Sequence, residues 1–345
     1  MPPIHTPEGD PVLRMEDVEV TYNTEDGDVF AVRGVSYDLF PDETLALVGE
    51  SGCGKSQSSY AAMGLVQPPG VVSGRILFDR GDGNGSVDIL KLKPNSSAMR
   101  QIRGGPMAMV FQEPMTALSP VHRIGHHLDE VLKLHTDLDA SQRYERACEL
   151  IGHVGIPDAE RRYRQYSFEF SGGMRQRIMI AVALACNPRV LFADEPTTGL
   201  DVTIQAQILS LMRSLRDQHR MGVVLITHDL AVVAENADRV AVMYLGRIVE
   251  TADVETVFRH PRHPYTIALL KSVVGSPLAS DGRLQAIKGT VPGPYDRVAG
   301  CPFHPRCPLA KPGLCDGDRV PELSDISDGH QAACFRLDQT ADQET

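Results

Sequence analysis

The chain has 345 residues, of which 42% are hydrophobic and 23% are charged, and its formal net charge is −11. These values are ordinary for a water-soluble protein that is large enough to bury an extended core and carry an appendage. Because the charge balance is acidic and no basic stripe is present to neutralise phosphates along a duplex, no nucleic-acid partner is expected. A single nucleotide is not excluded, since it needs only a local group of donors.

Neither a targeting segment nor a membrane-spanning segment is predicted. Residues 1–11 read MPPIHTPEGDP and lack a basic start followed by an apolar run, so they are interpreted as an N-terminal tail. The longest apolar run, Ile178 to Cys186, has about half the length that a spanning helix requires. We therefore expect a cytoplasmic protein that reaches a membrane only through partners.

The first predicted elements are strands on either side of a glycine-rich loop. Short apolar stretches predict strands over residues 12–22, 29–39 and 44–50. The glycine-rich loop at 49–56 is followed by helical spacing to about Leu65, and strand-like character returns over 71–92 around a turn rich in Gly and Asp.

The second half alternates helices with buried strands. Helical spacing extends from about residue 120 to 166, and the runs VLFADE (190–195) and VVLIT (223–227) read as strands separated by a helix. Strands that alternate with helices around a glycine-rich loop predict an α/β fold with a mainly parallel sheet. From about Thr251 onward Pro and Gly become frequent, which predicts an irregular appendage.

A phosphate-binding loop is predicted at Gly49 to Ser56. The segment GESGCGKS matches G-x-x-x-x-G-K-[ST] directly after an apolar strand. Its glycines let backbone N–H groups surround phosphates, Lys55 is expected to reach the β- and γ-phosphates, and the Ser56 hydroxyl to help hold Mg²⁺. The rival interpretation is a chance glycine-rich turn. The predicted nucleotide contacts are Gly49, Ser51, Gly52, Cys53, Gly54, Lys55, Ser56 and Gln57, in which Cys53 occupies a variable position as filler.

Two carboxylates follow the strand at 190–194. Asp194 is predicted to orient Mg²⁺ through water, and Glu195 is placed to polarise an attacking water. Taken alone, Asp-Glu after a strand is a common solvated loop end.

A second anion site is predicted in FSGGMRQR, where Ser171, Gly172 and Gly173 begin an apolar helical run. One nucleotide cannot easily use this site and the Lys55 loop within one monomer. The sequence therefore predicts a head-to-tail pair of subunits, with each nucleotide between the Lys55 loop of one and the Ser171 helix of the other.

In this order, the motifs resemble the ATP-binding cassette of ABC transporters over about residues 12–250. The resemblance implies an ABC-type P-loop NTPase fold with a mixed core sheet, an antiparallel β subdomain and a helical subdomain at about 113–172. It identifies Gly49–Ser56 as the Walker A loop, 190–194 with Glu195 as Walker B and the catalytic base, and 170–174 as the signature motif. The signature departs from the family pattern at Phe170 and at Met174, which cannot hydrogen-bond a ribose.

The same resemblance assigns roles to four further residues. Gln112 would contact Mg²⁺ or the attacking water and couple to membrane subunits, and His228 would contact the γ-phosphate. Tyr22 would stack on adenine, and Asp201 lies in the D-loop. Taken alone, Tyr22 would be a half-buried strand aromatic, and Gln112 and His228 would be polar loop residues.

Residues 251–345 resemble the cysteine-rich C-terminal extension of dipeptide, oligopeptide and nickel importers. In that branch four thiols are associated with a [4Fe–4S] cluster, which would assign Cys301, Cys307, Cys315 and Cys334. Their spacing, C-x5-C-x7-C-x18-C, lacks the close pairs usual for structural zinc, and a reducing cytosol favours metal ligation over disulfides. Zinc and unligated thiols remain open; His304 and His330 are possible zinc ligands that we expect to face solvent.

The resemblance implies an ATPase subunit of an ABC importer for short peptides, with ATP and Mg²⁺ as cofactors. Its partners would be a second homologous ATPase subunit, either identical or distinct, two transmembrane permease subunits and an extracytoplasmic binding protein. The chain would lie peripherally on the cytoplasmic face of the cell membrane. The alternatives are a non-transport ABC ATPase acting mechanically on another macromolecule, an importer of nickel or another small solute, and a metal- or redox-sensing protein.

Overall fold

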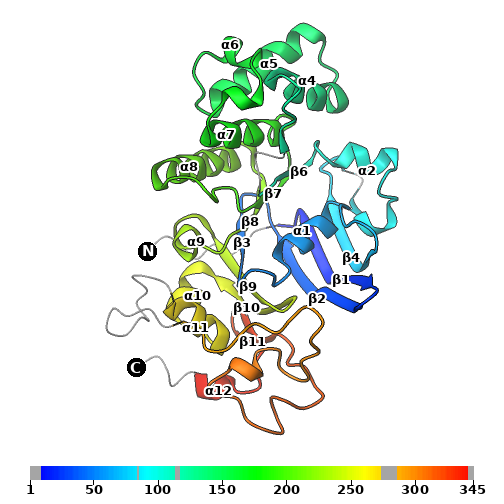
Figure 1. Cartoon of the computed structure of the whole chain (residues 1–345). Coiled ribbons are helices and arrows are strands. Elements are labelled where there is room, and N and C mark those ends of the chain that lie inside the picture. Colours follow the sequence, from blue (N-terminus) through cyan, green and yellow to red (C-terminus); the bar gives the residue numbers. More distant parts are fainter. Residues whose placement is uncertain (1–8, 84, 113–116, 273–285, 341–345) are drawn as a thin grey trace.

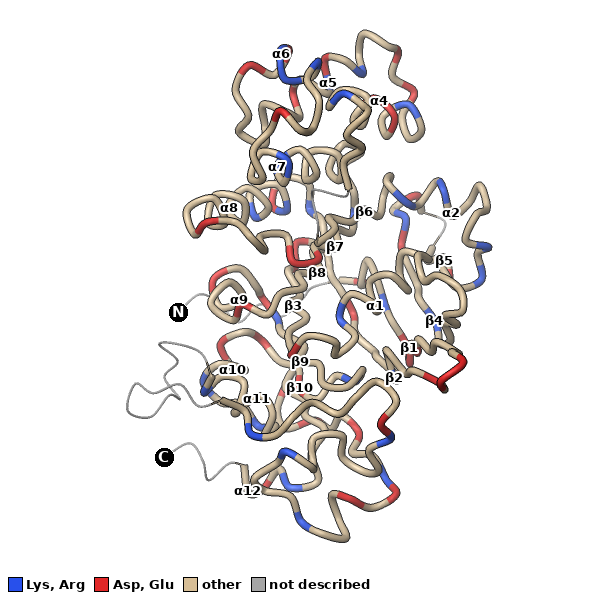
Figure 2. The backbone as a smooth tube through the Cα atoms, viewed as in Figure 1, with Lys and Arg blue, Asp and Glu red and all other residues tan. Residues whose placement is uncertain are grey.

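The computed structural model describes residues 9–83, 85–112, 117–272 and 286–340 (Figure 1). The predicted tail at 1–11, helical subdomain at 113–172 and extension at 251–345 therefore lie partly outside the described residues. In the described part, no helix combines the length and the apolar character needed to cross a bilayer. In the view of Figure 2, Lys and Arg are interspersed with Asp and Glu over the helical lobe and the extension.

Four strands form a small antiparallel sheet in the order β2-β1-β4-β5. Their bounds are β1 Leu13–Thr24, β2 Gly27–Leu39, β4 Gly70–Asp79 and β5 Ser86–Asp88. Along β1 the buried Leu13 and Met15 alternate with exposed Arg14. A bulge after Met15, with Asp17 at a φ of 48°, restores the alternation so that Val18 is buried again.

The larger sheet has eight strands in the order β11-β12-β10-β9-β3-β8-β7-β6. The five strands from β9 to β6 pair in parallel, and β10, β12 and β11 add antiparallel pairs. This confirms the predicted mixed α/β sheet. The bounds are β3 Thr44–Val48, β6 Met107–Val110, β7 Val190–Asp194, β8 Gly222–Ile226, β9 Arg239–Tyr244, β10 Arg247–Asp253, β11 Ser324–Ser327 and β12 His330–Ala332.

The helices lie against this sheet and in a lobe beyond it. Figure 1 shows α4, α5 and α6 at one end of the molecule, next to α7 and away from the antiparallel sheet. The α-helices are α1 Lys55–Ala62, α2 Ser97–Ile102, α4 Ile124–His135, α5 Ala140–His153, α6 Ala159–Tyr163, α7 Gly172–Ala183, α8 Val202–His219, α9 Leu230–Asn236, α10 Val254–Arg259, α11 Pro264–Lys271 and α12 Leu337–Thr340. Short 3₁₀ turns occupy Ile89–Lys91, Ser167–Glu169 and His304–Arg306.

Strand β7 separates two cores because its side chains alternate between the faces of the sheet. Leu191 packs in the core shared with α4, α5, α7 and α8, whereas Phe192 packs in the core shared with the antiparallel sheet. All five residues of β7 are buried, as are those of β3 and β8. The carboxyl ends of these three parallel strands therefore meet at one edge, which is where ligands bind in such sheets.

The extension is more regular than its sequence predicts. Strand β10 runs through the predicted boundary at residue 250, α10 follows it directly, and α11 begins at Pro264. The chain later returns to pair β12 with β10, opposite Glu250 and Thr251. The expectation of an irregular appendage is wrong for these segments because apolar residues of α11, including Tyr265 and Leu270, pack against the sheet. Between 286 and 323 the only described regular element is the 3₁₀ turn His304–Arg306.

A buried carboxylate joins the extension to the sheet. Glu250 is fully buried and accepts hydrogen bonds from the backbone N–H groups of Arg262 (2.6 Å) and His263 (2.9 Å). His330 Nε2 lies 2.8 Å from Glu250 Oε1. The expectation that His330 faces solvent is wrong, because a buried carboxylate needs this partner; only 3% of His330 is exposed.

We expect acid to destabilise the fold through His263. Burial lowers the pKa of His263 to about 4, and its Nδ1 accepts the N–H of Tyr265 in the neutral form. An unfolded histidine has a pKa of about 6.5. The unfolded chain therefore takes up this proton first, and the stability present above pH 6.5 is lost as pH falls towards 4. By pH 5 the loss should be about 2 kcal/mol of unfolding free energy.

Denaturant titrations of the wild type and of His263→Asn at pH 7.5 and pH 5 would measure this effect. Asparagine retains an acceptor for the N-terminus of α11 but does not titrate. The variant should be less stable at pH 7.5 and should lose about 2 kcal/mol less than the wild type on acidification. An equal loss in both proteins would contradict the role of His263.

Candidate functional site

The predicted phosphate loop connects β3 to α1, and two of its glycines are required by their surroundings. Gly49 and Gly54 have φ values of 151° and 102°. A Cβ at Gly49 would lie 2.2 Å from Met243 O, and one at Gly54 would lie 2.2 Å from Ala31 O. Side chains are thus excluded where the loop passes β9 and β2. Ser51 and Gly52 lie exposed at the tip of the loop.

Lys55 lies inside this loop. It is the first residue of α1 and is buried, and its Nζ donates to the carbonyl oxygens of Gly49 (2.8 Å) and Glu50 (3.2 Å). Cys53 is also buried, with its Sγ 3.6 Å from Nζ, and burial raises the pKa of the thiol. The loop therefore presents one fixed ammonium group beside a neutral thiol.

Ser56 and Asp194 form a pair that fits a divalent cation. Ser56 Oγ, in the first turn of α1, donates at 2.9 Å to Oδ1 of Asp194, the last residue of β7. Asp194 is 1% exposed, its Oδ2 has no hydrogen-bond partner in the structure, and burial raises its pKa. An unpartnered buried carboxylate oxygen is costly unless a ligand binds it. Hydroxyl and carboxylate oxygens are the ligands that Mg²⁺ prefers.

The carboxylate of Glu195 contacts three side chains, of which Gln112 and His228 were predicted site residues and Thr198 was not. Its Oε2 accepts from Gln112 Nε2 (3.1 Å) and from Thr198 Oγ1 (2.8 Å), and His228 Nδ1 lies 3.1 Å from Oε1. Burial acts to raise the pKa of Glu195, but the hydrogen bonds from Thr198 and His228 outweigh it and hold the pKa below its usual value. The carboxylate is therefore ionised at neutral pH and can accept a proton from water.

The backbone of Glu195 has a φ of 46°, a left-handed conformation that is uncommon outside glycine. Its N–H donates to Ile226 O at 2.9 Å, which fixes this turn against β8. With the backbone in this conformation, the side chain of Glu195 contacts His228, which follows β8.

Tyr22 and Gln57 are also in contact, although Tyr22 lies on a strand of the antiparallel sheet and Gln57 lies on helix α1. The hydroxyl of Tyr22, on β1, donates to Gln57 Oε1 on α1 at 2.6 Å. The structure thus places the predicted adenine-stacking tyrosine beside the helix that begins at Lys55.

The predicted second anion site is exposed and belongs to another part of the molecule. Ser171 caps α7, with its Oγ accepting from the N–H of Met174 at 3.4 Å, and Gly172 and Gly173 form the first turn. Asp201 caps α8 in the same way through the N–H of Ile204. Figure 1 shows α7 and α1 apart, so within one chain Ser171 does not join the Lys55 loop.

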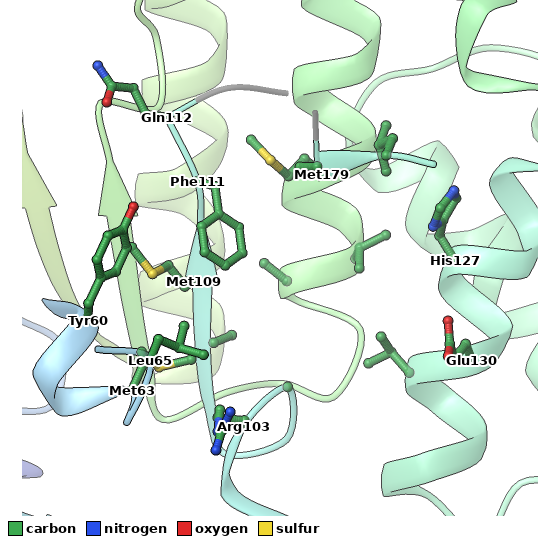
Figure 3. A pocket seen from close by; sticks show the side chains of 17 residues that line it. Tyr60, Met63, Leu65, Arg103, Met109, Phe111, Gln112, His127, Glu130 and Met179 are labelled. Atoms are coloured by element: carbon green, nitrogen blue, oxygen red, sulfur yellow. The ribbon is translucent and has the colours of Figure 1, made fainter. Parts of the chain in front are cut away.

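An apolar pocket of about 790 Å³ lies next to Gln112 (Figure 3). Figure 3 shows that Phe111, the residue after β6, and Met179 of α7 approach it from one side, while His127 and Glu130 reach it from α4. Phe111 is 39% exposed, which is high for a phenylalanine beside a core strand. The lining residues include Tyr60, Met63, Leu65, Met109, Phe111, Gln112, His127, Glu130, Val131, Met179 and Val182.

The four cysteines of the extension line one small cavity, together with His263 and His304. They are free thiols, and burial raises the pKa of Cys301 to about 12 and that of Cys307 to about 11. Across the described residues, no group of three or more His, Cys, Asp or Glu side chains could hold a metal ion. The structure thus gathers the thiols without forming a site for a single ion.

Sequence reasoning missed three contacts of the site. Thr198 contacts Glu195 and follows it by three residues in the chain. Its place in the segment PTTGLD, directly after the predicted carboxylates, could have indicated this contact. Tyr265 and Arg306 of the extension both contact Glu50 of the phosphate loop. No local pattern indicates the Arg306 contact, because the partners are 256 residues apart in the chain.

Comparison with known proteins finds a matching family for the N-terminal part of the chain and another for the C-terminal part. The family described as ABC transporter matches residues 32–198, and the family described as oligopeptide/dipeptide transporter, C-terminal region, matches 249–315. The dipeptide transport ATP-binding protein DppD of Bacillus subtilis is 46% identical over 334 residues, which cover 96% of each chain. DppD of Escherichia coli is 44% identical over 324 residues, covering 94% of this chain and 96% of that protein.

Two solved structures are similar in fold. A dimeric post-hydrolysis state of the ATP-binding cassette MJ0796 with ADP and phosphate aligns with a TM-score of 0.61 and 24% identity, covering 70% of this chain and 98% of that one. The cbiO1 structure from Clostridium perfringens, part of the ABC transporter complex cbiONQ, aligns with a TM-score of 0.59 and 26% identity, covering 76% and 95%.

Proposed function

This chain belongs to the ABC transporter ATPases that carry an oligopeptide/dipeptide transporter C-terminal region, and we propose that it hydrolyses ATP to drive the import of short peptides. The observation that carries the chemistry is the Glu195 carboxylate, which Gln112, Thr198 and His228 hold beside the Ser56–Asp194 pair. The observation that carries the cargo is the near full-length similarity to two dipeptide transport ATP-binding proteins.

In this proposal, the chain's own residues bind ATP and move one proton. The amides of the loop Gly49–Lys55 and the ammonium of Lys55 bind the β- and γ-phosphates. Ser56 and Asp194 would hold Mg²⁺, which neutralises charge on the phosphate oxygens. Glu195 accepts a proton from the water that attacks the γ-phosphorus, and the bond to the bridging oxygen breaks to give ADP and phosphate. His228 and Gln112 orient Glu195 and that water.

A second ATPase subunit completes the site. Ser171 and Gly172 are exposed at the start of α7, where free N–H groups and the helix dipole favour an anion. A second copy or a homologous subunit, placed head to tail, brings this surface onto the triphosphate held by the Lys55 loop. Cysteines introduced at Ser51 and Gly172 should crosslink between subunits when MgATP is bound, in a Glu195→Gln background that prevents turnover.

The apolar pocket is proposed as the docking site for a permease subunit. Its lining includes Phe111, Met179 and Gln112, and the Gln112 side chain also donates a hydrogen bond to Glu195. A permease segment in this pocket would therefore sense whether the hydrolytic site is closed. By this arrangement the chain lies on the cytoplasmic face of the membrane, beneath two permease subunits that receive cargo from an extracytoplasmic binding protein.

The four thiols of the extension are proposed to bind a [4Fe–4S] cluster. Four cysteines around one cavity form the usual donor set for this cluster, whose irons spread the ligands more widely than a single zinc ion does. The cluster would link the four cysteines to one another and so stabilise a segment that contains little helix or strand.

Metal analysis after anaerobic purification would test this proposal. We expect about four irons and four sulfides per chain in the wild type, and loss of both in Cys307→Ser. Cys186→Ser is the matched control, because this partly buried cysteine lies outside the cavity; its iron content should be unchanged. Stoichiometric zinc without iron in the wild type would contradict the cluster while leaving the ATPase unaffected.

Transport is tested with the chain assembled with its membrane and ATPase partners in vesicles. A dipeptide supplied with the binding protein should stimulate ATP hydrolysis several-fold and should accumulate in an ATP-dependent manner. Nickel and a simple sugar are the comparison cargoes. ATP-driven uptake of nickel without uptake of any dipeptide would replace the peptide proposal, and ATPase activity that no cargo stimulates would contradict transport.

A further inference from the structure

We propose that Arg306 of the extension is a positioning residue for ATP binding, because it neutralises Glu50 and holds the phosphate loop in place. The proposal rests on the ATPase function above and adds a residue that lies outside the ATPase motifs. If Arg306 has this role, the extension contributes directly to ATP binding and is not merely an appendage.

The pair between Arg306 and Glu50 has two parallel hydrogen bonds. Arg306 Nη1 donates to Glu50 Oε2 at 2.6 Å and Nη2 donates to Oε1 at 3.0 Å. The Arg306 side chain is 4% exposed and that of Glu50 is 26% exposed, so solvent screens the pair only in part. Paired, planar contacts of this type fix geometry as well as charge.

The guanidinium group is itself held from other directions. Nε donates to Lys288 O at 3.2 Å, and Nη1 also lies 3.4 Å from the hydroxyl of Tyr244. The guanidinium carbon lies 5.9 Å from the centre of the Tyr244 ring, on β9. Arg306 therefore enters the pair in a fixed orientation, with little side-chain freedom left to lose.

The extension also holds the backbone of Glu50. The N–H of Glu50 donates to the hydroxyl of Tyr265 at 2.8 Å. Tyr265 is fully buried, and the centre of its ring lies 4.6 Å from the ring centre of Tyr244 and 5.4 Å from that of Phe303. The carbonyl of Glu50 accepts from Lys55, so three groups of this one loop residue have partners.

The charge on Glu50 explains why this pairing bears on ATP. Glu50 lies between Gly49 and Ser51 in a loop that receives a triphosphate, and an unpaired carboxylate there would repel the ligand. Arg306 cancels this charge at a position where solvent screens it only in part. Loss of Arg306 would therefore weaken ATP binding, and removal of the Glu50 charge as well should restore most of it.

Direct binding of MgATP to the full-length chain tests this inference, with all variants made in a Glu195→Gln background so that ATP is not consumed. Arg306→Gln should weaken binding about tenfold. Arg306→Lys should weaken it less, and Glu50→Gln should bind at least as tightly as the parent. The double variant Arg306→Gln/Glu50→Gln should recover most of the loss. Arg14→Gln is the matched control, because it breaks another two-bond pair, with Asp38, on an exposed surface.

A purely structural contact would give a different result. If the double variant bound as weakly as Arg306→Gln, or if Arg306→Gln bound like its parent, the inference would be overturned. If Arg306→Gln fails to fold, the same comparison can be made between the single variant Arg306→Lys and the double variant Arg306→Lys/Glu50→Gln. In the assembled transporter, Arg306→Lys with Glu195 intact should raise the KM for ATP and change kcat by less than about twofold. If the parent chain itself bound no ATP, the proposed function would fail instead.

Discussion

Replacing Glu195 with Gln is expected to lower ATP hydrolysis by about a thousandfold while leaving MgATP binding within a few-fold of the wild type. The amide has the shape of the carboxylate and can still contact Thr198 and Gln112, but it cannot accept a proton from water. Asp194 and Lys55, which are proposed to hold the cation and the phosphates, are unchanged. The variant should therefore accumulate the ATP-bound, closed pair of subunits.

Single-turnover hydrolysis and equilibrium ATP binding would separate these two effects. Glu149→Gln, which changes an exposed glutamate of α5 that pairs with Arg146, is a control for the loss of one surface charge. It should hydrolyse ATP at the wild-type rate. Retention of more than about a tenth of the wild-type rate in Glu195→Gln would mean that another group activates the water.

Replacing Gly54 with Ala should reduce ATP affinity by about a hundredfold. The new Cβ would lie 2.2 Å from Ala31 O at a backbone φ of 102°, so both the contact and the conformation oppose it. Because Ala31 belongs to a sheet strand, the loop must move instead. Gly54 directly precedes Lys55, and a displaced loop no longer directs its amides and the ammonium group to the same phosphates.

Gly52→Ala is the matched control within the same loop. Gly52 also has a positive φ, of 82°, but a Cβ there would have no atom within 4 Å. It should bind ATP several-fold more weakly than the wild type, clearly less affected than Gly54→Ala. Calorimetric titration with MgATP, with the melting temperature measured in parallel, distinguishes lost affinity from unfolding. Equal losses in the two variants would contradict the steric explanation.

The phosphate loop and the carboxylates of Asp194 and Glu195 could be predicted because each motif is contiguous and adjoins a recognisable strand. An α/β fold with a mainly parallel sheet followed from short apolar runs alternating with helical spacing, whereas the mixed character of the sheet was implied only by the resemblance to ABC cassettes. The helix α11 was also within reach of local reasoning, since Pro264 at its start and the apolar run after it are ordinary helix signals. The abundance of Pro and Gly in the surrounding segment led to the irregular prediction.

Contacts between distant segments could not be predicted in this way. His330 is buried because Glu250 needs a partner, and the two residues are 80 positions apart. The pairing of Arg306 with Glu50 joins still more distant parts of the chain. A carboxylate at the second position of a phosphate loop gives no indication of which residue neutralises it, because this depends on how the last hundred residues fold back.

Strand β12 has a consequence for any shortened form of this protein. It covers the outer side of β10 and pairs with Glu250 and Thr251. A chain that ends near residue 250, at the nominal limit of the cassette, would leave those backbone donors and acceptors open along a sheet border. It would also uncover the apolar surface formed by Val249 and Tyr244. Such a fragment should pair with strands of other molecules and precipitate, so trimming this protein to about its first 250 residues would yield aggregates and not a minimal enzyme.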